Sequence, residues 1–180
     1  GTDAMQIYLK AYGIKRNDEI ILSSHTMIAT ASAIKFCGAK PVPVDIKKSD
    51  GLIDPKEIEK KINKKTKAIL VTHLNGRTCA MDEIIKISKK YNLKLFEDAA
   101  QSLGSKYMKK NAGTFGDASS ISFYPAKILG CFGDGDIILT SNKLMAKKMR
   151  IMRDHGRDEN GSIRYWGYNS RLDNIQAGIL

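Results

Sequence analysis

"AILVTHLNGRTCAMDEIIKISKKYNLKLFED", residues 68–98, determines the fold class that the sequence predicts. Its two short apolar runs, 68–73 and 93–98, are typical of buried strands. The charged segment between them, 81–92, has the periodicity of an amphipathic helix. A strand, a helix and a second strand in this order favour a parallel sheet, because a helical crossover can return the chain to the same end of the sheet.

The same alternation continues on both sides of this unit. Asp54 is placed to cap a helix whose first position is Pro55, and Gly38 is placed to stop an earlier helix. The predicted strands are 19–23, 40–46, 119–124 and 136–141, and the further predicted helices are 26–38, 53–62 and 142–153. We therefore expect an α/β fold, a three-layer sandwich with a mostly parallel sheet and helices on both faces.

Composition limits the partners that the sequence suggests. The 180 residues carry a formal net charge of +11, mainly from lysines on helical segments, which favours solvated helix faces. Attraction of an anionic substrate is a second possibility, whereas few aromatic residues and no recognition motif argue against nucleic acid.

Three widely spaced cysteines predict reduced, buried thiols in a cytoplasmic protein and no metal site. No apolar run approaches the roughly 20 residues of a membrane span.

The candidate site is predicted from the residues that follow each strand, since ligands of such sheets bind at the carboxyl ends of the strands. His73 ends one strand, Glu97 and Asp98 end the next, and Ser122 to Lys127 end a third. Lys127 lies in "SISFYPAKILGCFGDGD", residues 120–136, in a loop that proline and glycine keep from becoming a helix. An isolated lysine of this kind is usually a surface residue, but this one has an acidic neighbour.

A lysine and a carboxylate at the mouth of a parallel sheet suit Schiff-base chemistry with pyridoxal 5'-phosphate (PLP). Asp98 is the candidate for keeping the ring nitrogen of PLP protonated, so that the ring can accept electrons from the substrate carbon. Strand alternation points Glu97 to the opposite face. For the phosphate, the Gly1-Thr2 turn leads into a helix over 3–13 and offers free N–H groups. Ser122 offers either a further hydroxyl or an ordinary serine at the edge of the core.

Eight ordered motifs then resemble one family, the DegT/StrS sugar aminotransferases, which are fold-type I PLP enzymes. The motifs are "GTDAM", "SHTMIATASAI", "GAKPVPVDI", "TKAILVTHLNG", "LFEDAAQSLGSKY", "GTFGDASSISFYPAKILGCFGDGD", "MRDHGRD" and "GYNSRLDNIQAGIL". The resemblance covers essentially the whole chain. It implies that residues 1–180 are a fragment of the PLP-binding large domain, and that further residues before Gly1 and a smaller C-terminal domain are absent from it.

The resemblance also implies roles for individual residues. Lys127 matches the Schiff-base lysine and Asp98 the partner of the ring nitrogen. Gln101, one helical turn later, matches the glutamine near the phenolic oxygen of PLP. His73 matches a histidine near the cofactor, with a structural hydrogen bond as the open alternative. The matches to the phosphate ligands are Thr2, its neighbours Gly1 and Asp3, and Ser122.

Two further positions carry implications for stacking and assembly. Met27 stands where the family commonly has an aromatic residue on the pyridine ring, so we expect weaker stacking. Asn169 matches an asparagine that reaches the phosphate of the other subunit, which implies a homodimer with composite sites. From this chain alone, Asn169 is a turn residue before a helix over 171–180 that Ser170 would cap.

The implied reaction moves an amino group from an amino acid, usually glutamate in this family, to a nucleotide-linked keto-sugar for amino-sugar and cell-surface polysaccharide biosynthesis. Retention of Lys127 favours transamination over the dehydration catalysed by relatives that have histidine there. Two alternatives remain at this point. One is an aminotransferase acting on a carbocyclic ketone, and the other is a regulator of the same fold without turnover.

Overall fold

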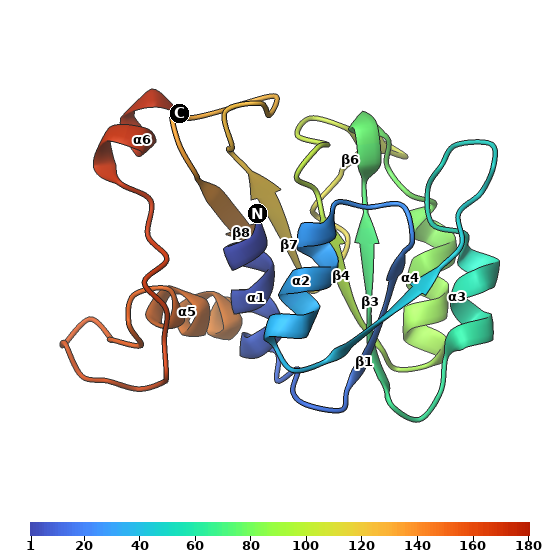
Figure 1. Ribbon diagram of the computed structural model, residues 1–180, viewed down its shortest axis with the longest axis horizontal. Coiled ribbons are helices and arrows are strands. Elements are labelled where there is room, and N and C mark those ends of the chain that lie inside the picture. The colour runs from blue at the N-terminus through green and yellow to red at the C-terminus, as the bar shows by residue number, and fades with distance from the viewer.

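A six-stranded sheet, in the strand order β2-β1-β3-β4-β7-β8, forms the middle layer of the protein (Figure 1). The computed structural model describes residues 1–180. All neighbouring strands are parallel except β8, which is antiparallel to β7. The mostly parallel sheet is therefore confirmed. The strand bounds are β1 Glu19–Ser23, β2 Lys40–Val44, β3 Thr66–Thr72, β4 Lys94–Asp98, β7 Ala118–Ser122 and β8 Asp136–Leu139.

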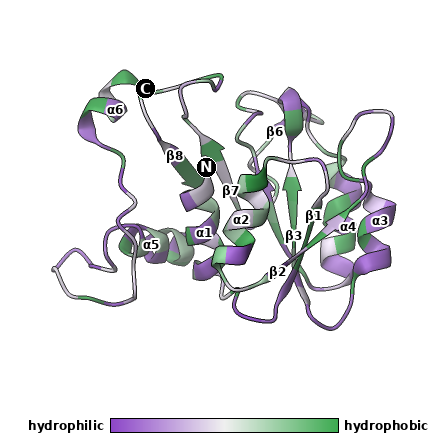
Figure 2. Ribbon diagram, viewed as in Figure 1, coloured by the Kyte–Doolittle hydropathy of each residue, from purple (hydrophilic) through white to green (hydrophobic).

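Helices cover both faces of the sheet, which completes the predicted three-layer sandwich. Helices α1 (Thr2–Ala11), α2 (Ile28–Phe36) and α5 (Lys143–Met152) pack on one face in a core that includes Tyr8 and Phe96. Helices α3 (Pro55–Lys61) and α4 (Met81–Lys90) pack on the other. Figure 2 shows hydrophilic residues on the exposed sides of α3 and α4, as expected for lysine-rich helices that bury one apolar face.

Side-chain alternation in β4 assigns neighbouring residues to different layers. Phe96 belongs to the core beneath α1 and α2, whereas Leu95 belongs to the core beneath α4. Continuing this alternation, Asp98 faces the α1 and α2 layer and Glu97 faces away from it. Both carboxylates are buried, so each depends on hydrogen-bond donors within its own layer.

Several local predictions are confirmed by the backbone. The Asp54 side chain accepts a hydrogen bond from the N–H of Lys56 and caps α3, and Gly38 has the positive φ expected after a helix. The three cysteines are free and buried, and burial raises the pKa of Cys37 to about 11 and that of Cys79 to about 12. None of the helices combines the length and the apolar character that crossing a membrane requires.

The last helix differs from the prediction. Helix α6 spans Asn174–Ile179 and its N-cap is Asp173, so the predicted start after Ser170 was wrong. The N–H of Ser170 instead donates to the carbonyl oxygen of Arg153, and Asn169 forms a bridge with Asp154. These bonds hold the chain extended before α6. Three short elements were also not predicted: η1 (Leu74–Gly76), β5 (Lys106–Tyr107) and β6 (Lys110–Asn111).

Candidate active site

Asp98 ends β4 as a buried carboxylate with two hydrogen-bond donors. Its Oδ2 accepts from the hydroxyl of Thr30 at 2.7 Å, and its Oδ1 accepts from the N–H of Ala100 at 3.1 Å. The phenol of Tyr8 lies nearby, where burial and then the charge of Asp98 raise the pKa of Tyr8. Only 3% of Asp98 is exposed, so the two donors replace water as its partners.

The start of α1 meets the ends of β4 and β7. A Cβ placed on Gly1 would lie 3.6 Å from the Cβ of Ser122 and 3.8 Å from the Cβ of Ala100, so Gly1 leaves a space between them. The N–H of Ala4 donates to Oδ2 of Asp136 at 3.2 Å. The N–H groups of Thr2 and Asp3 have no acceptor, as is usual in the first turn of a helix. The predicted phosphate ligands therefore converge at one edge of the sheet.

Lys127 is carried by a loop that leaves β7 at this same edge. The N–H of Phe123 donates to the carbonyl oxygen of Gly135, and the N–H of Cys131 donates to that of Phe123, which closes the loop on itself. The backbone of Lys127 is fixed by a hydrogen bond of 2.8 Å from its N–H to the carbonyl oxygen of Tyr124. Lys127 is partly exposed, and its amine makes no hydrogen bond or ion pair within the chain. The loop thus presents an amine without an internal partner.

Gln101 follows Asp98 into the turn that faces η1. Its Oε1 accepts from the N–H of Asn75 at 3.0 Å, and its carbonyl oxygen accepts from the N–H of Gly76. These bonds fix the carboxamide and leave Nε2 as a donor without a partner. Gln101 therefore offers a free N–H donor in the turn that follows β4.

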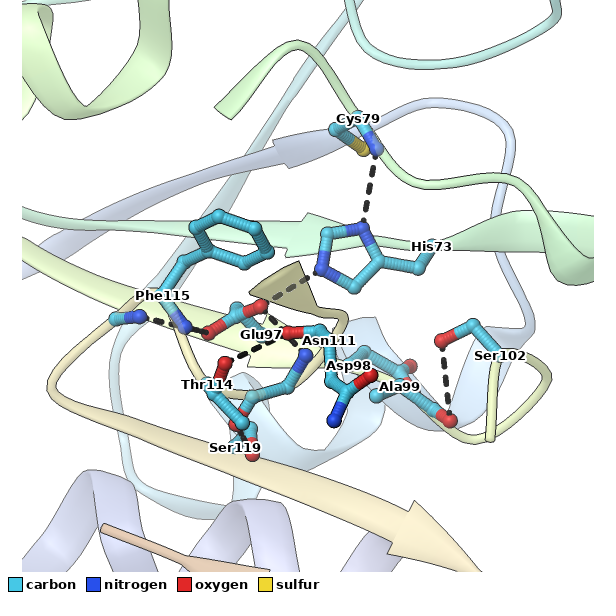
Figure 3. Close-up of polar contacts among 12 residues, drawn as sticks. His73, Cys79, Glu97, Asp98, Ala99, Ser102, Asn111, Thr114, Phe115 and Ser119 are labelled. Atoms are coloured by element: carbon cyan, nitrogen blue, oxygen red, sulfur yellow. Dashed lines mark hydrogen bonds and ion pairs between the residues drawn. The ribbon is translucent and has the colours of Figure 1, made fainter. Parts of the chain in front are cut away.

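His73 lies outside this group of residues. Its side chain is fully buried, and its Nδ1 accepts from the N–H of Cys79 at 3.2 Å, so Nε2 carries the proton and donates to Oε2 of Glu97 at 2.8 Å (Figure 3). Glu97 also accepts from the N–H groups of Gly113, Phe115 and Gly116. Both ring nitrogens of His73 are used within this layer, which matches the alternative of a structural hydrogen bond.

Met27 and Asn169 have exposed positions. Met27 is the N-cap residue of α2 and is 61% exposed, with its side chain not part of either core. The side chain of Asn169 makes no hydrogen bond and lines a cleft of about 810 Å³ beside β8, together with Gly1, Thr2 and Asp3. Lys127 and Asp98 do not line this cleft. The structure thus brings Gly1 and Ser122 together beside the end of β4, and places Asn169 in a cleft with Gly1, Thr2 and Asp3. His73 lies in a different layer.

Sequence reasoning missed the threonines behind Asp98. Thr30 comes from α2, Thr26 precedes α2, and Thr72 ends β3, and their hydroxyls are joined to one another. Three isolated threonines in separate segments have no characteristic spacing. Thr72 lies opposite Asp98 in the register of β3 and β4, but the sequence alone did not predict that register.

The three-layer sandwich around a mostly parallel sheet defines the class of protein. It is an α/β domain with the fold type I of PLP-dependent transferases. The chain belongs to the DegT/DnrJ/EryC1/StrS aminotransferase family, whose sequence model matches residues 1–180.

Two curated relatives of similar sequence identity have names of different kinds, one enzymatic and one regulatory. The chain is 45% identical over 180 residues to a dTDP-3-amino-3,6-dideoxy-alpha-D-galactopyranose transaminase of Aneurinibacillus thermoaerophilus, covering all of the chain and 50% of the relative. It is 44% identical over 180 residues to a pleiotropic regulatory protein of Geobacillus stearothermophilus, covering all of the chain and 48% of that relative. The chain thus spans about half the length of the curated relatives it matches.

Solved structures support the fold independently. The structure of Streptomyces venezuelae DesV in complex with a ketimine intermediate matches with a TM-score of 0.95 and 39% identity, over 99% of this chain and 48% of that one. The structure of NtdA from Bacillus subtilis with bound cofactor PMP matches with a TM-score of 0.92 and 37% identity, over 99% of this chain and 41% of that one.

Proposed function

We propose that the protein containing these 180 residues is a PLP-dependent aminotransferase that transfers an amino group from an amino acid to a nucleotide-linked keto-sugar. The observation that carries the proposal is that three features lie at the carboxyl ends of the neighbouring strands β4 and β7. They are the buried Asp98, the space between Gly1 and Ser122, and the loop after β7 that carries the unpartnered Lys127. A primary amine, a buried carboxylate and free backbone donors are the three groups that this cofactor requires.

The residues present fit the cofactor in chemical terms. Gly1 leaves open the space that a side chain would fill next to Ser122, and the N–H groups of Thr2 and Asp3 are free to bind a phosphate. Asp98 would face the ring nitrogen, and Nε2 of Gln101 would donate to the phenolic oxygen. When bound, the cofactor supplies an aldehyde and a ring that accepts electrons from the substrate carbon. Lys127 would hold the cofactor through its amine and, once displaced by the amino donor, would move the proton at the substrate carbon.

The substrate class is inferred from relatives and charge. A relative with 45% identity is named as a transaminase of a dTDP-linked amino-sugar. A net charge of +11 would attract a nucleotide-linked sugar, which is an anion, through long-range electrostatics. Glutamate as the amino donor and biosynthesis of surface polysaccharide as the setting follow from the family resemblance. We also propose a cytoplasmic location, in keeping with three free thiols.

A regulator without turnover is the second candidate function, because a relative with 44% identity is named as a pleiotropic regulatory protein. The two candidates differ in one measurable respect. A competent aminotransferase converts its cofactor to the amine form when glutamate is added, whereas a regulator without turnover leaves it unchanged. The absorbance spectrum of the full-length protein, recorded with and without glutamate, separates them.

The first prediction concerns Lys127. We expect full-length Lys127→Ala to lose the absorbance of covalently bound PLP and to lose turnover, since no other amine is held in this loop. The matched control is Lys143→Ala, which removes an exposed lysine at the start of α5 and should behave as the wild type. Turnover is followed by mass spectrometry of the aminated sugar nucleotide across a panel of keto-sugar nucleotides. Normal turnover in Lys127→Ala would overturn the proposed function.

A further inference from the structure

Three threonine hydroxyls form a continuous hydrogen-bonded chain that ends on Asp98. The hydroxyl of Thr72 lies 2.9 Å from that of Thr26, which lies 2.8 Å from that of Thr30. Thr30 in turn donates to Oδ2 of Asp98 at 2.7 Å. Thr30 is fully buried and Thr72 is 5% exposed, so most of this chain is shielded from water.

The direction of every proton in the chain is determined. Each hydroxyl has a single proton, and the proton of Thr30 is used by Asp98. Thr26 must therefore donate to Thr30, and Thr72 must donate to Thr26. All three dipoles then point toward the carboxylate, and hydrogen bonds aligned in this way strengthen one another.

The hydrogen-bonded threonines connect three elements that also position Asp98, namely α2, β3 and β4. Thr72 and Asp98 are direct neighbours across β3 and β4, and Thr30 lies in the first turn of α2. Because Oδ1 of Asp98 is held by Ala100 and Oδ2 by Thr30, rotation of the carboxylate is restricted from both sides. A buried carboxylate keeps its charge only while donors replace water.

We propose that Thr30, Thr26 and Thr72 are positioning residues that keep Asp98 ionised and correctly oriented for the ring nitrogen of the cofactor. This inference rests on the proposed function, in which Asp98 pairs with that nitrogen. Asp98 and the nitrogen share one proton, and Thr30 stabilises the arrangement in which Asp98 is the anion. Loss of the Thr30 hydroxyl makes Asp98 the stronger base and shifts the shared proton away from the ring.

The test uses full-length protein loaded with PLP that carries ¹⁵N in the ring, and it reads the nitrogen signal by NMR at neutral pH. In Thr30→Val we expect the ratio of protonated to neutral ring nitrogen to fall about tenfold, the effect of one hydrogen bond to a charged group. Thr26→Val and Thr72→Val should each lower the ratio about twofold, because they leave the Thr30–Asp98 hydrogen bond in place and remove only the strengthening that the other hydroxyls give it. Thr30→Ser retains a hydroxyl and should restore the wild-type signal.

A matched control separates positioning from stability. Thr66→Val removes a buried threonine hydroxyl at the opposite end of β3, where it accepts from the N–H of Asn63, and should leave the nitrogen signal unchanged. Asp98→Asn tests the underlying function, since it should move the signal to the neutral position. If Asp98→Asn has no effect, the proposed role of Asp98 fails. If Asp98→Asn moves the signal and Thr30→Val does not, the inference about the threonine chain is overturned.

Discussion

Glu97 is a buried carboxylate whose role is to hold the surrounding backbone in place. Its two carboxylate oxygens accept four hydrogen bonds, from Nε2 of His73 and from the N–H groups of Gly113, Phe115 and Gly116. This glycine-rich turn leads directly into β7, which ends at Ser122. Glu97 thus fixes the backbone at the start of β7, and the loop that follows the end of β7 carries Lys127.

The second prediction concerns this residue. Glu97→Gln replaces an acceptor oxygen by an NH₂ group, which then meets two donors. We expect the free energy of unfolding to fall by about 3 kcal/mol, because buried donors are left without acceptors. Denaturant unfolding of the full-length protein measures this. Glu57→Gln, at an exposed ion pair with Lys60, is the control and should change little. Equal effects of both substitutions would contradict this role of Glu97.

Among the elements, the loop that bears Lys127 depends on one glycine. A Cβ on Gly130 would lie 2.6 Å from the carbonyl oxygen of Pro125 and 2.9 Å from its Cα, closer than real Cβ contacts. The backbone of Pro125 cannot move freely, because Phe123 and Gly135 close the loop on either side. Gly130 is therefore required by close approach of backbone within the loop.

This constraint gives the third prediction. Gly130→Ala should displace the Lys127 loop and lower PLP retention at least tenfold, as expected for a misplaced reactive group. Equilibrium dialysis of full-length protein against PLP measures retention. Gly178→Ala, in α6, is the control because a Cβ there meets no atom within 4 Å. Unchanged retention in Gly130→Ala would show that the loop tolerates the added methyl group.

Element by element, the sequence predicted what depends on local chemistry. The Asp54 cap and the stop at Gly38 were predicted because each acts within a few residues. The start of α6 was missed because Ser170 is bonded to Arg153, seventeen residues earlier. The strands β5 and β6 have two residues each, too few to show alternation.

In the candidate site, too, features that depend on the local pattern were predicted and features that depend on tertiary packing were not. Alternation along the strand was enough to place Asp98 and Glu97 on opposite faces, since successive side chains of a strand point to opposite sides. The role of His73 was not decided, because the sequence left both a place near the cofactor and a structural hydrogen bond open. The threonine chain could not be predicted, because its contacts arise only when α2, β3 and β4 pack together.

For the whole molecule, assembly is the open proposal. We propose a homodimer in which Asn169 reaches the phosphate site of the partner. Its side chain is exposed and has no partner within the chain. Large apolar side chains are exposed on the same C-terminal part and on the Lys127 loop, which an interface would bury. They include Trp166 at 99%, Phe132 at 84% and Ile175 at 74%.

The fourth prediction tests this assembly with two variants of the full-length protein. Asn169→Ala should weaken PLP retention and leave Lys127 able to hold the cofactor. When Asn169→Ala is mixed with Lys127→Ala under subunit exchange, each heterodimer gains one site with both residues intact. That site should retain PLP as the wild type does. Retention no better than in the Asn169→Ala homodimer would contradict the cross-subunit role, and sedimentation of the wild type as a monomer would contradict the dimer.

The opposite orientations of Glu97 and Asp98 also limit how this chain can vary in length. Adding or removing one residue within β4 would exchange the faces of the two carboxylates. The shorter acid would then face His73 and the glycine turn, and the longer one would face Thr30. Substitutions within Lys94–Asp98 change single contacts, whereas an insertion or deletion there disrupts two layers at once. Changes of length must therefore fall in the connections, such as the turn at Asn92, whose φ of 51° already marks a break in the regular backbone.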